Sequence, residues 1–206
     1  GYPPVQFLPD LDHCREWLRS YLQTYIQRDI RDLSQVQDLG LFHRFVQLLA
    51  GRTARLVNYS ESGRDLSINY KTAQHYLSLL EASYVWKTLS PFFRNTEKRL
   101  VKSPKGIMLD SGLACLLTGI FSAESLEASP LRGAIFESFV ISELLKLCSA
   151  FSFDVQLFHF RSTGGVEVDL VIEYGGRVIP MEIKYSASVH RAWGTGITRF
   201  NETFRK

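Results

Sequence analysis

The sequence predicts an α/β fold of the α+β kind, with helices in its N-terminal part and a strand-rich core near its C-terminal end. Two patterns indicate this. Apolar residues recur at helical spacing up to about residue 82 and again over 133–148, whereas β-prone runs with glycine turns occupy 155–184. With 206 residues, 45% of them hydrophobic, the chain can bury a core as one large domain or two small ones.

The first two predicted helices are each apolar along one side. In the helix expected over 13–30, the apolar residues follow the spacing of a one-sided helix. They are Leu18, Tyr21, Leu22, Tyr25 and Ile26. A second helix is expected over 34–50, with Gly51 as its C-terminal stop. The side chains that it would bury are Phe42, Phe45, Val46 and Leu49. Residues 1–36 are therefore expected to form an initial helical segment.

The next unit has the order of a winged helix. Residues 60–66 and 71–82 predict two short helices joined by a turn, which is the spacing of a helix-turn-helix. Two β-prone stretches follow, at 84–89 and 100–109. Because helices followed by such a hairpin are typical of a winged helix, we expect this fold over residues 37–110.

Two groups of polar residues in this unit are candidates for contact with nucleic acid. The helix at 71–82 would turn outward side chains that can read bases in the major groove, namely Lys71, Thr72, Gln74 and His75. The hairpin adds cations that attract phosphates, namely Arg94, Lys98, Arg99, Lys102 and Lys105. The formal net charge is only +3, so DNA would have to bind at such a local patch. The alternative is a solvated wing, because winged helices also serve as protein adaptors.

The last part of the chain predicts one long helix and three strands. A short helix at 111–117 belongs to a linker over 111–132, and the helix at 133–148 opens a C-terminal unit over 133–206. The three strands are expected at 155–160, 166–173 and 177–184.

Charged residues on two of these strands form the candidate site. Strand side chains alternate between faces, so Glu182 and Lys184 should point to one side and Ile183 to the other. The same period puts Asp169 and Val171 together on the preceding strand, where Asp169 can lie beside Glu182. Two such carboxylates can hold magnesium and leave positions for waters and a phosphate oxygen. The alternative is a solvated charged face.

The order of these residues resembles the restriction-endonuclease-like superfamily, often called PD-(D/E)xK. The matching residues are Glu137 in a helix, Asp169 in a strand, and Glu182 and Lys184 in the next strand. The resemblance implies an αβββ core of the restriction-endonuclease type. In it, Asp169 and Glu182 would bind magnesium weakly, while Lys184 and Glu137 would be catalytic.

The whole chain is also similar to the region that follows the ATPase core in a prokaryotic AAA-type ATP-binding family. The stretches that carry this similarity are residues 25–30, 79–84, 98–105 and 133–137. The resemblance implies that an ATP-binding domain precedes a C-terminal domain of unknown function, and that residues 1–36 end the lid of the ATPase. The chain has no Gly-Lys dipeptide for a phosphate-binding loop, so we expect no ATPase activity from this chain alone.

Other features narrow the class of protein. The sequence has no Gly-x-Ser-x-Gly motif of serine hydrolases and no His-Glu-x-x-His motif of zinc proteases. It also has no Gly-x-Gly-x-x-Gly motif for binding a dinucleotide. Cys14, Cys115 and Cys148 suit neither a disulfide framework nor a tetrahedral zinc site. No apolar run approaches the ~20 residues of a membrane span. A cytoplasmic location without a membrane partner is expected, and the sequence is compatible with an oligomer.

Two functions from different classes therefore follow from the sequence. The first is a magnesium-dependent nuclease module that acts on nucleic acid, with DNA as the expected partner. The second is a regulatory module that binds DNA or protein and uses a nuclease-like core only as a scaffold. Carboxylates held close together without a cation are costly, which favours the first function.

Overall fold

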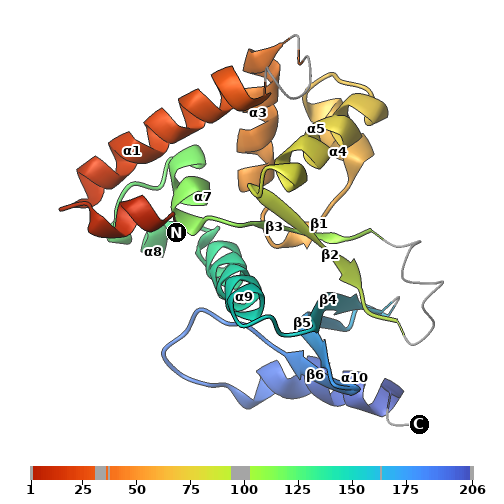
Figure 1. Cartoon of the computed structure of the whole chain (residues 1–206). Coiled ribbons are helices and arrows are strands. Elements are labelled where there is room, and N and C mark those ends of the chain that lie inside the picture. Colours follow the sequence, from red (N-terminus) through yellow and green to blue (C-terminus); the bar gives the residue numbers. More distant parts are fainter. Residues whose placement is uncertain (1, 31–35, 37, 94–102, 163, 205–206) are drawn as a thin grey trace.

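The computed structural model describes residues 2–30, 36, 38–93, 103–162 and 164–204. Outside the described residues lie four cations expected on the wing, Arg94, Lys98, Arg99 and Lys102. The described chain has helices in its N-terminal part and one six-stranded sheet that extends into its C-terminal part (Figure 1). The predicted α+β class is confirmed. Among the described residues, no helix is long and apolar enough to cross a membrane.

Helices α1 and α3 form the N-terminal part. Helix α1 spans Leu11–Thr24 and continues as a π-helical turn, η2, over Tyr25–Ile30. Helix α3 spans Leu39–Ala50 and so begins after the predicted residue 34. Asp38 caps its first turn, because the Asp38 side chain accepts a hydrogen bond from the backbone N–H of Leu41. The predicted inward side chains of both helices are buried, except Tyr21, which is half-buried.

The winged-helix order is present between residues 39 and 108. After α3 come β1 (Arg55–Leu56), α4 (Tyr59–Asp65), α5 (Tyr70–Ala82), β2 (Trp86–Pro91) and β3 (Lys105–Met108). Strand β3 pairs antiparallel with both β1 and β2. Helix α5 buries Ala73, Tyr76, Leu77 and Leu80, which turns its polar side outward.

A single sheet joins the wing hairpin to the C-terminal strands. Strands β4 (Val155–Arg161), β5 (Glu167–Tyr174) and β6 (Arg177–Met181) pair antiparallel in order. Strand β4 also pairs parallel with β2, so the strand order is β1-β3-β2-β4-β5-β6. The predicted linker over 111–132 contains helices α7 (Ser111–Leu117) and α8 (Ala123–Ala128).

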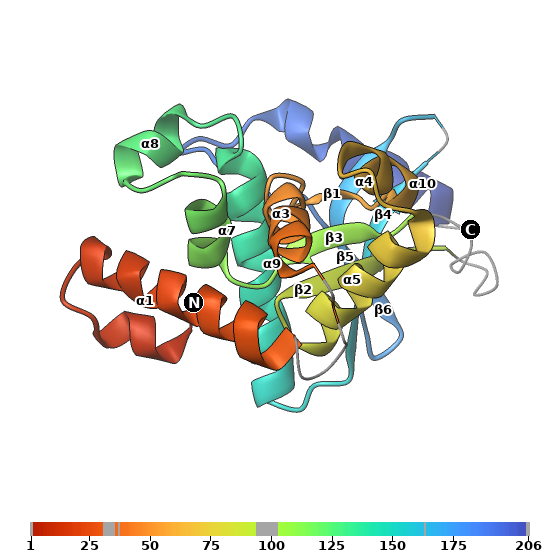
Figure 2. The same cartoon turned by 90° about the horizontal axis from the view of Figure 1, so that it is seen from above.

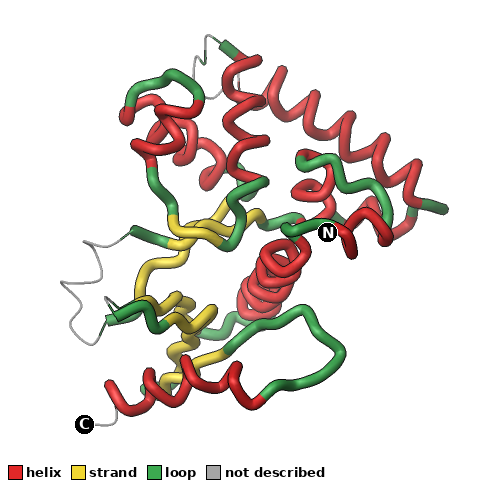
Figure 3. Tube along the Cα trace, turned by 180° about the vertical axis from the view of Figure 1, so that it is seen from behind, coloured by secondary structure: helices red, strands yellow, loops and turns green. Residues whose placement is uncertain are grey.

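Two helices cover opposite faces of the C-terminal half of the sheet (Figures 1 and 3). Helix α9 (Arg132–Ala150) packs Ile141 against Leu170 on one face. Helix α10 (Thr195–Phe204) packs Phe200 on the other face, in a cluster rich in phenylalanine. The αβββ order of this half therefore forms three layers, with the sheet in the middle.

The buried side of α9 is not the one that its apolar residues predict. At helical spacing, Phe136, Phe139, Val140, Leu144 and Leu147 predict a broad inward side. In the structure, Phe139 and Leu147 are 41% and 52% exposed. The fully buried stripe instead contains Ile135, Ser138 and Ile141. Ser138 can be buried there because its hydroxyl lies 2.6 Å from that of Thr53.

Candidate carboxylate and lysine site

The residues of the candidate site meet at one edge of the C-terminal layers, where β5 begins and β6 ends. Glu137 projects from the second turn of α9, and Asp169 comes from β5. Glu182 and Lys184 follow the end of β6. The fold therefore brings together all four residues that the sequence selected, together with Lys105, which the sequence placed on the wing.

A β-bulge positions Asp169. Residues 158–160 of β4 lie opposite residues 168–171 of β5, so β5 has one residue more than its partner here. As a result Val168 and Val171 both pack in the cluster under α10, which strict alternation forbids. The prediction that Asp169 and Val171 share a face is therefore wrong, because the bulge turns Asp169 towards the α9 side.

The Asp169 carboxylate organises the segment after β6. Its Oδ2 atom accepts hydrogen bonds from the backbone N–H of Ile183 at 2.9 Å and from Lys184 Nζ at 2.7 Å. The backbone N–H of Ile183 bonds to this side chain, and the regular strand ends at Met181. The predicted strand, 177–184, is therefore three residues too long. Glu182 and Lys184 still project to one side, since Lys184 Nζ lies 2.8 Å from Glu182 Oε2.

Lys105 is the member of the site that the sequence did not reveal. Its Nζ lies 2.6 Å from Glu137 Oε1 and 3.2 Å from the backbone oxygen of Asp169. The side chain is only 12% exposed, so it does not lie on the outer surface of the wing. No local pattern indicates this contact, because it depends on the pairing of β2 with β4.

Burial and ion pairing set the charges of the site. Burial raises the pKa of Glu137 to about 7, and the neighbouring Lys105 opposes this rise. Burial would lower the pKa of Lys184, but its hydrogen bonds to Asp169 and Glu182 outweigh burial and raise it to about 12. Lys184 is therefore a fixed positive charge, and Glu137 is a group that changes charge near neutral pH.

The pKa values of the two acids bound to Lys184 shift in opposite directions. Burial alone would raise the pKa of Asp169, but the hydrogen bonds from Lys184 and from the backbone of Ile183 lower it below its usual value. Burial raises the pKa of Glu182, because its hydrogen bond with Lys184 compensates only in part. Asp169 is thus the firmly ionised acid of the pair.

His159 is a buried, neutral side chain close enough to Lys105 to be affected by its charge. It lies opposite the β5 bulge and is 2% exposed. Burial, followed by the charge of Lys105, lowers its pKa to about 4. In the part of the chain that the structure describes, its Nε2 atom has no hydrogen-bond partner. His159 therefore remains uncharged at neutral pH.

Asp169 and Glu182 are the residues that could hold a metal ion. Both carboxylates contact the Lys184 ammonium group, so a cation already occupies the space between them. Within the described ranges, no three His, Cys, Asp or Glu side chains are arranged to bind one metal ion. A pair of carboxylates fits magnesium, which keeps several waters and takes phosphate oxygens, better than zinc, which takes three or four protein ligands.

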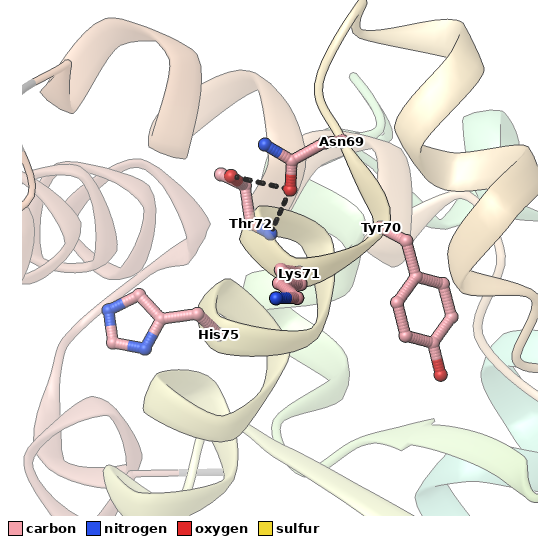
Figure 4. Close-up of a pocket in the computed structure, with 5 residues that line it drawn as sticks. All are labelled: Asn69, Tyr70, Lys71, Thr72 and His75. Carbon is pink, nitrogen blue, oxygen red and sulfur yellow. Dashed lines mark hydrogen bonds between the residues drawn. The ribbon is translucent and has the colours of Figure 1, made fainter.

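The predicted reading helix of the winged-helix unit is accessible. Lys71, Gln74 and His75 are exposed on α5, and Thr72 is half-buried with its N–H bound to the Asn69 side chain at 2.8 Å. Lys71 and His75 line a shallow hollow of about 490 Å³ at the N-terminal end of α5. Figure 4 shows both side chains projecting from this helix. The main packing partners of α5 are α3, α4 and β2, so this surface is not covered by the C-terminal layers.

Comparison with known proteins identifies two families. Residues 1–124 match the family described as Domain of unknown function (DUF8612), and residues 132–206 match Domain of unknown function (DUF4143). The expectation of a domain of unknown function is thereby confirmed, and neither description names an ATPase or a nuclease.

Two curated mycobacterial proteins are similar to almost the whole chain. They are Uncharacterized protein Rv2008c of Mycobacterium tuberculosis and Uncharacterized protein Mb2031c of Mycobacterium bovis. Each is 31% identical over 188 residues, which is 91% of this chain. The chain spans only 42% of the length of each relative. No solved structure matches the chain.

Proposed function

The chain belongs to the DUF8612 family, whose model matches residues 1–124. We propose that the cluster of carboxylates and lysines, which lies mostly beyond that range, is a magnesium-dependent site for phosphodiester hydrolysis in nucleic acid. We further propose that the chain is the C-terminal module of a longer AAA-type ATP-binding protein. In support, the matched region is less than half of each mycobacterial relative, which leaves room there for a nucleotide-binding domain.

One observation carries the proposal. Two carboxylates from different elements converge on one cation, with Asp169 Oδ2 and Glu182 Oε2 lying 2.7 and 2.8 Å from Lys184 Nζ. Two adjacent acids raise the free energy of a fold unless a cation compensates them. The arrangement, with Glu137 on α9 behind it, agrees with the motif order of the PD-(D/E)xK superfamily and supports assignment to that superfamily.

Each residue then has a role that its environment permits. Asp169 and Glu182 would hold magnesium, which when bound polarises a phosphate oxygen. Lys184 stays protonated, so it orients water and phosphate by charge and does not act as a base. Glu137 can accept a proton from water near neutral pH. Lys105 is a positioning residue that holds Glu137 against the Asp169 backbone.

Water, Glu137 and solvent account for every bond and proton of the hydrolysis. The oxygen of a water molecule forms a bond to phosphorus while the bond from phosphorus to the leaving oxygen breaks. Glu137 takes a proton from the attacking water, and the leaving oxygen takes a proton from solvent. The proton on Glu137 later returns to solvent, which restores the site.

A cleavage assay tests the proposal. The chain is incubated with magnesium or manganese and with linear or branched DNA. Asp169→Asn and Glu182→Gln should each abolish metal-dependent cleavage, because both keep the shape of the side chain but remove the negative charge. Asp154→Asn, an exposed acid before β4, is the matched control and should cleave like the wild type. Equal cleavage by the wild type and the Asp169→Asn/Glu182→Gln double variant would contradict the assignment of the cleavage to Asp169 and Glu182.

The second candidate is a regulatory module that binds DNA without cutting it. The exposed Lys71, Gln74 and His75 on α5 favour it, because polar side chains on such a helix are placed to enter a major groove. Lys71→Ala should weaken binding to duplex DNA for all sequences and reduce the salt slope by about 1 if Lys71 contacts a phosphate. Unchanged binding and an unchanged salt slope would remove this candidate.

A further inference from the structure

An open cavity of about 510 Å³ adjoins the candidate site at Lys184. Its wall comes from the segment between α8 and α9, from the stretch after β6, and from a 3-10 helix, η3 (Arg191–Gly194). In Figure 2 the blue stretch that follows β6 passes beside the end of α8. The Tyr185 hydroxyl donates a hydrogen bond to Glu127 Oε1 and joins the two segments. The cavity is thus an extension of the site with a defined wall, and its volume is typical of ligand sites.

Two aromatic side chains line this cavity. Tyr185 is 40% exposed, and its ring packs edge-on against Phe136 of α9 with centroids 5.3 Å apart. Trp193 packs edge-on against His190 at 4.8 Å. Both rings are therefore held by neighbours while they remain part of the cavity wall. Aromatic rings in such a position accept the bases of unpaired strands by stacking, with little dependence on sequence.

Two cations and one acid share the same wall. Arg132 is 51% exposed, and its Nη1 donates to the backbone oxygen of Glu127 at 2.7 Å. The Glu127 carboxylate is engaged, with one oxygen bound to the Tyr185 hydroxyl and the other 3.6 Å from Arg132. Lys184 is 37% exposed at the junction with the carboxylate site. Both cations have acidic partners, Glu127 for Arg132 and the Asp169–Glu182 pair for Lys184, so the wall offers N–H donors to a phosphate without a net positive charge.

We propose that this cavity binds an unpaired nucleotide of the strand whose phosphodiester lies at Lys184, so that the site acts on single-stranded nucleic acid in preference to duplex. The inference rests on the proposed function, because Lys184 belongs to both the cavity and the carboxylate site. Bases in a duplex are stacked on one another and cannot reach Tyr185 or Trp193 without leaving the helix. A duplex could offer this wall only its phosphates.

Binding without metal separates this inference from the nuclease function. A fluorescent oligothymidylate, an oligouridylate and a duplex of equal length are titrated with the full chain in the presence of a chelator. Trp193→Ala and Tyr185→Leu should each weaken binding of the single strands about tenfold, as loss of base stacking predicts. Tyr185→Phe keeps the ring and should retain most of the affinity. Duplex binding should be weaker and unchanged by these substitutions.

The outcomes distinguish the two proposals. If Trp193→Ala and Tyr185→Leu bind single strands as tightly as the wild type, or if duplex binds as well as single strands, the cavity does not select unpaired nucleotides. That result leaves the cleavage test with Asp169→Asn unaffected. Conversely, persistent cleavage by the Asp169→Asn/Glu182→Gln double variant would rule out the carboxylates as the cleavage site, whereas loss of single-strand binding in the aromatic variants would still establish the cavity. Thermal unfolding of each variant confirms that the fold is retained.

Discussion

The carboxylate of Asp169 takes the place of a strand partner for the backbone of Ile183. Its Oδ2 atom accepts the Ile183 N–H at 2.9 Å, just after the regular pairing of β5 with β6 ends. The same oxygen also binds Lys184 Nζ. A side chain that belongs to the candidate site thus also fixes the path of the segment that carries two further members of the site, Glu182 and Lys184.

The double role of Asp169 predicts different effects for two substitutions. Asp169→Asn retains an oxygen that can accept the Ile183 N–H, whereas Asp169→Ala leaves this buried N–H without its partner. We expect Asp169→Ala to lower the free energy of unfolding by about 1–3 kcal/mol, and Asp169→Asn to lower it by clearly less. Urea unfolding of both variants measures the difference. Equal losses would show that the hydrogen bond to Ile183 contributes little.

Glu137 should make the stability of the chain depend on pH. Its pKa is about 7 in the folded chain and near 4.5 when unfolded, so the folded state holds more protons between these values. The free energy of unfolding should therefore fall as pH rises through this window, by on the order of 3 kcal/mol at most. Urea unfolding at about pH 5 and about pH 8 tests this.

Glu137→Gln provides the control for that measurement. Glutamine has no titrating group, so the variant should lose the part of the slope that belongs to Glu137 and keep the part that belongs to Glu182, whose pKa is also raised. A wild-type stability that rises with pH across the window would mean that Lys105 holds Glu137 ionised in the folded chain.

The helical patterns and the identity of the acids could be predicted from the sequence, because both depend on local spacing. Leu18 and Leu22 on α1, and Tyr76 and Leu80 on α5, are buried as their periodicity predicts. The orientation of Asp169 could not be predicted in the same way. Strict alternation places it on the face of Val171, and the bulge that reverses this arises from pairing with β4, which no local pattern specifies.

Lys105 shows the same limit for a long-range contact. In the sequence it belongs to a run of cations typical of a wing, and only the joining of β2 to β4 brings it to Glu137 on α9. The motif order indicates Glu137, the partner of Lys105. It cannot indicate Lys105 itself, because Lys105 comes from a different part of the chain. The cavity beside Lys184 was missed for this reason too, because three separate segments form its wall.

The pair formed by Lys105 and Glu137 predicts non-additive substitutions. Both side chains are nearly buried, at 12% and 13% exposure, so removing one leaves the other uncompensated. At about pH 8, where Glu137 of the wild type is ionised, Lys105→Met should lower the free energy of unfolding by up to about 3 kcal/mol, and adding Glu137→Gln should recover part of this loss. A double-mutant cycle by urea unfolding measures the coupling. Strictly additive effects would argue against an energetically important pair.

Gly196 allows α10 to approach the site closely. A Cβ atom at this position would collide with the backbone oxygen of Glu167 and with Glu182 Oε1. Gly196→Ala should therefore displace α10 or Glu182 and lower the free energy of unfolding by about 1–3 kcal/mol. Gly194→Ala is the matched control, because a Cβ there meets no atom within 4 Å of the described chain. Similar melting temperatures for both variants would contradict this packing.

Binding of manganese tests most directly whether Asp169 and Glu182 form a metal site. Electron paramagnetic resonance counts the manganese ions bound to the chain, with and without an uncleavable phosphorothioate oligonucleotide. The expected result is weak binding that tightens when the oligonucleotide supplies phosphate oxygens, and that is lost in the Asp169→Asn/Glu182→Gln double variant. Manganese binding of equal strength in the wild type and the double variant would contradict the assignment of the site.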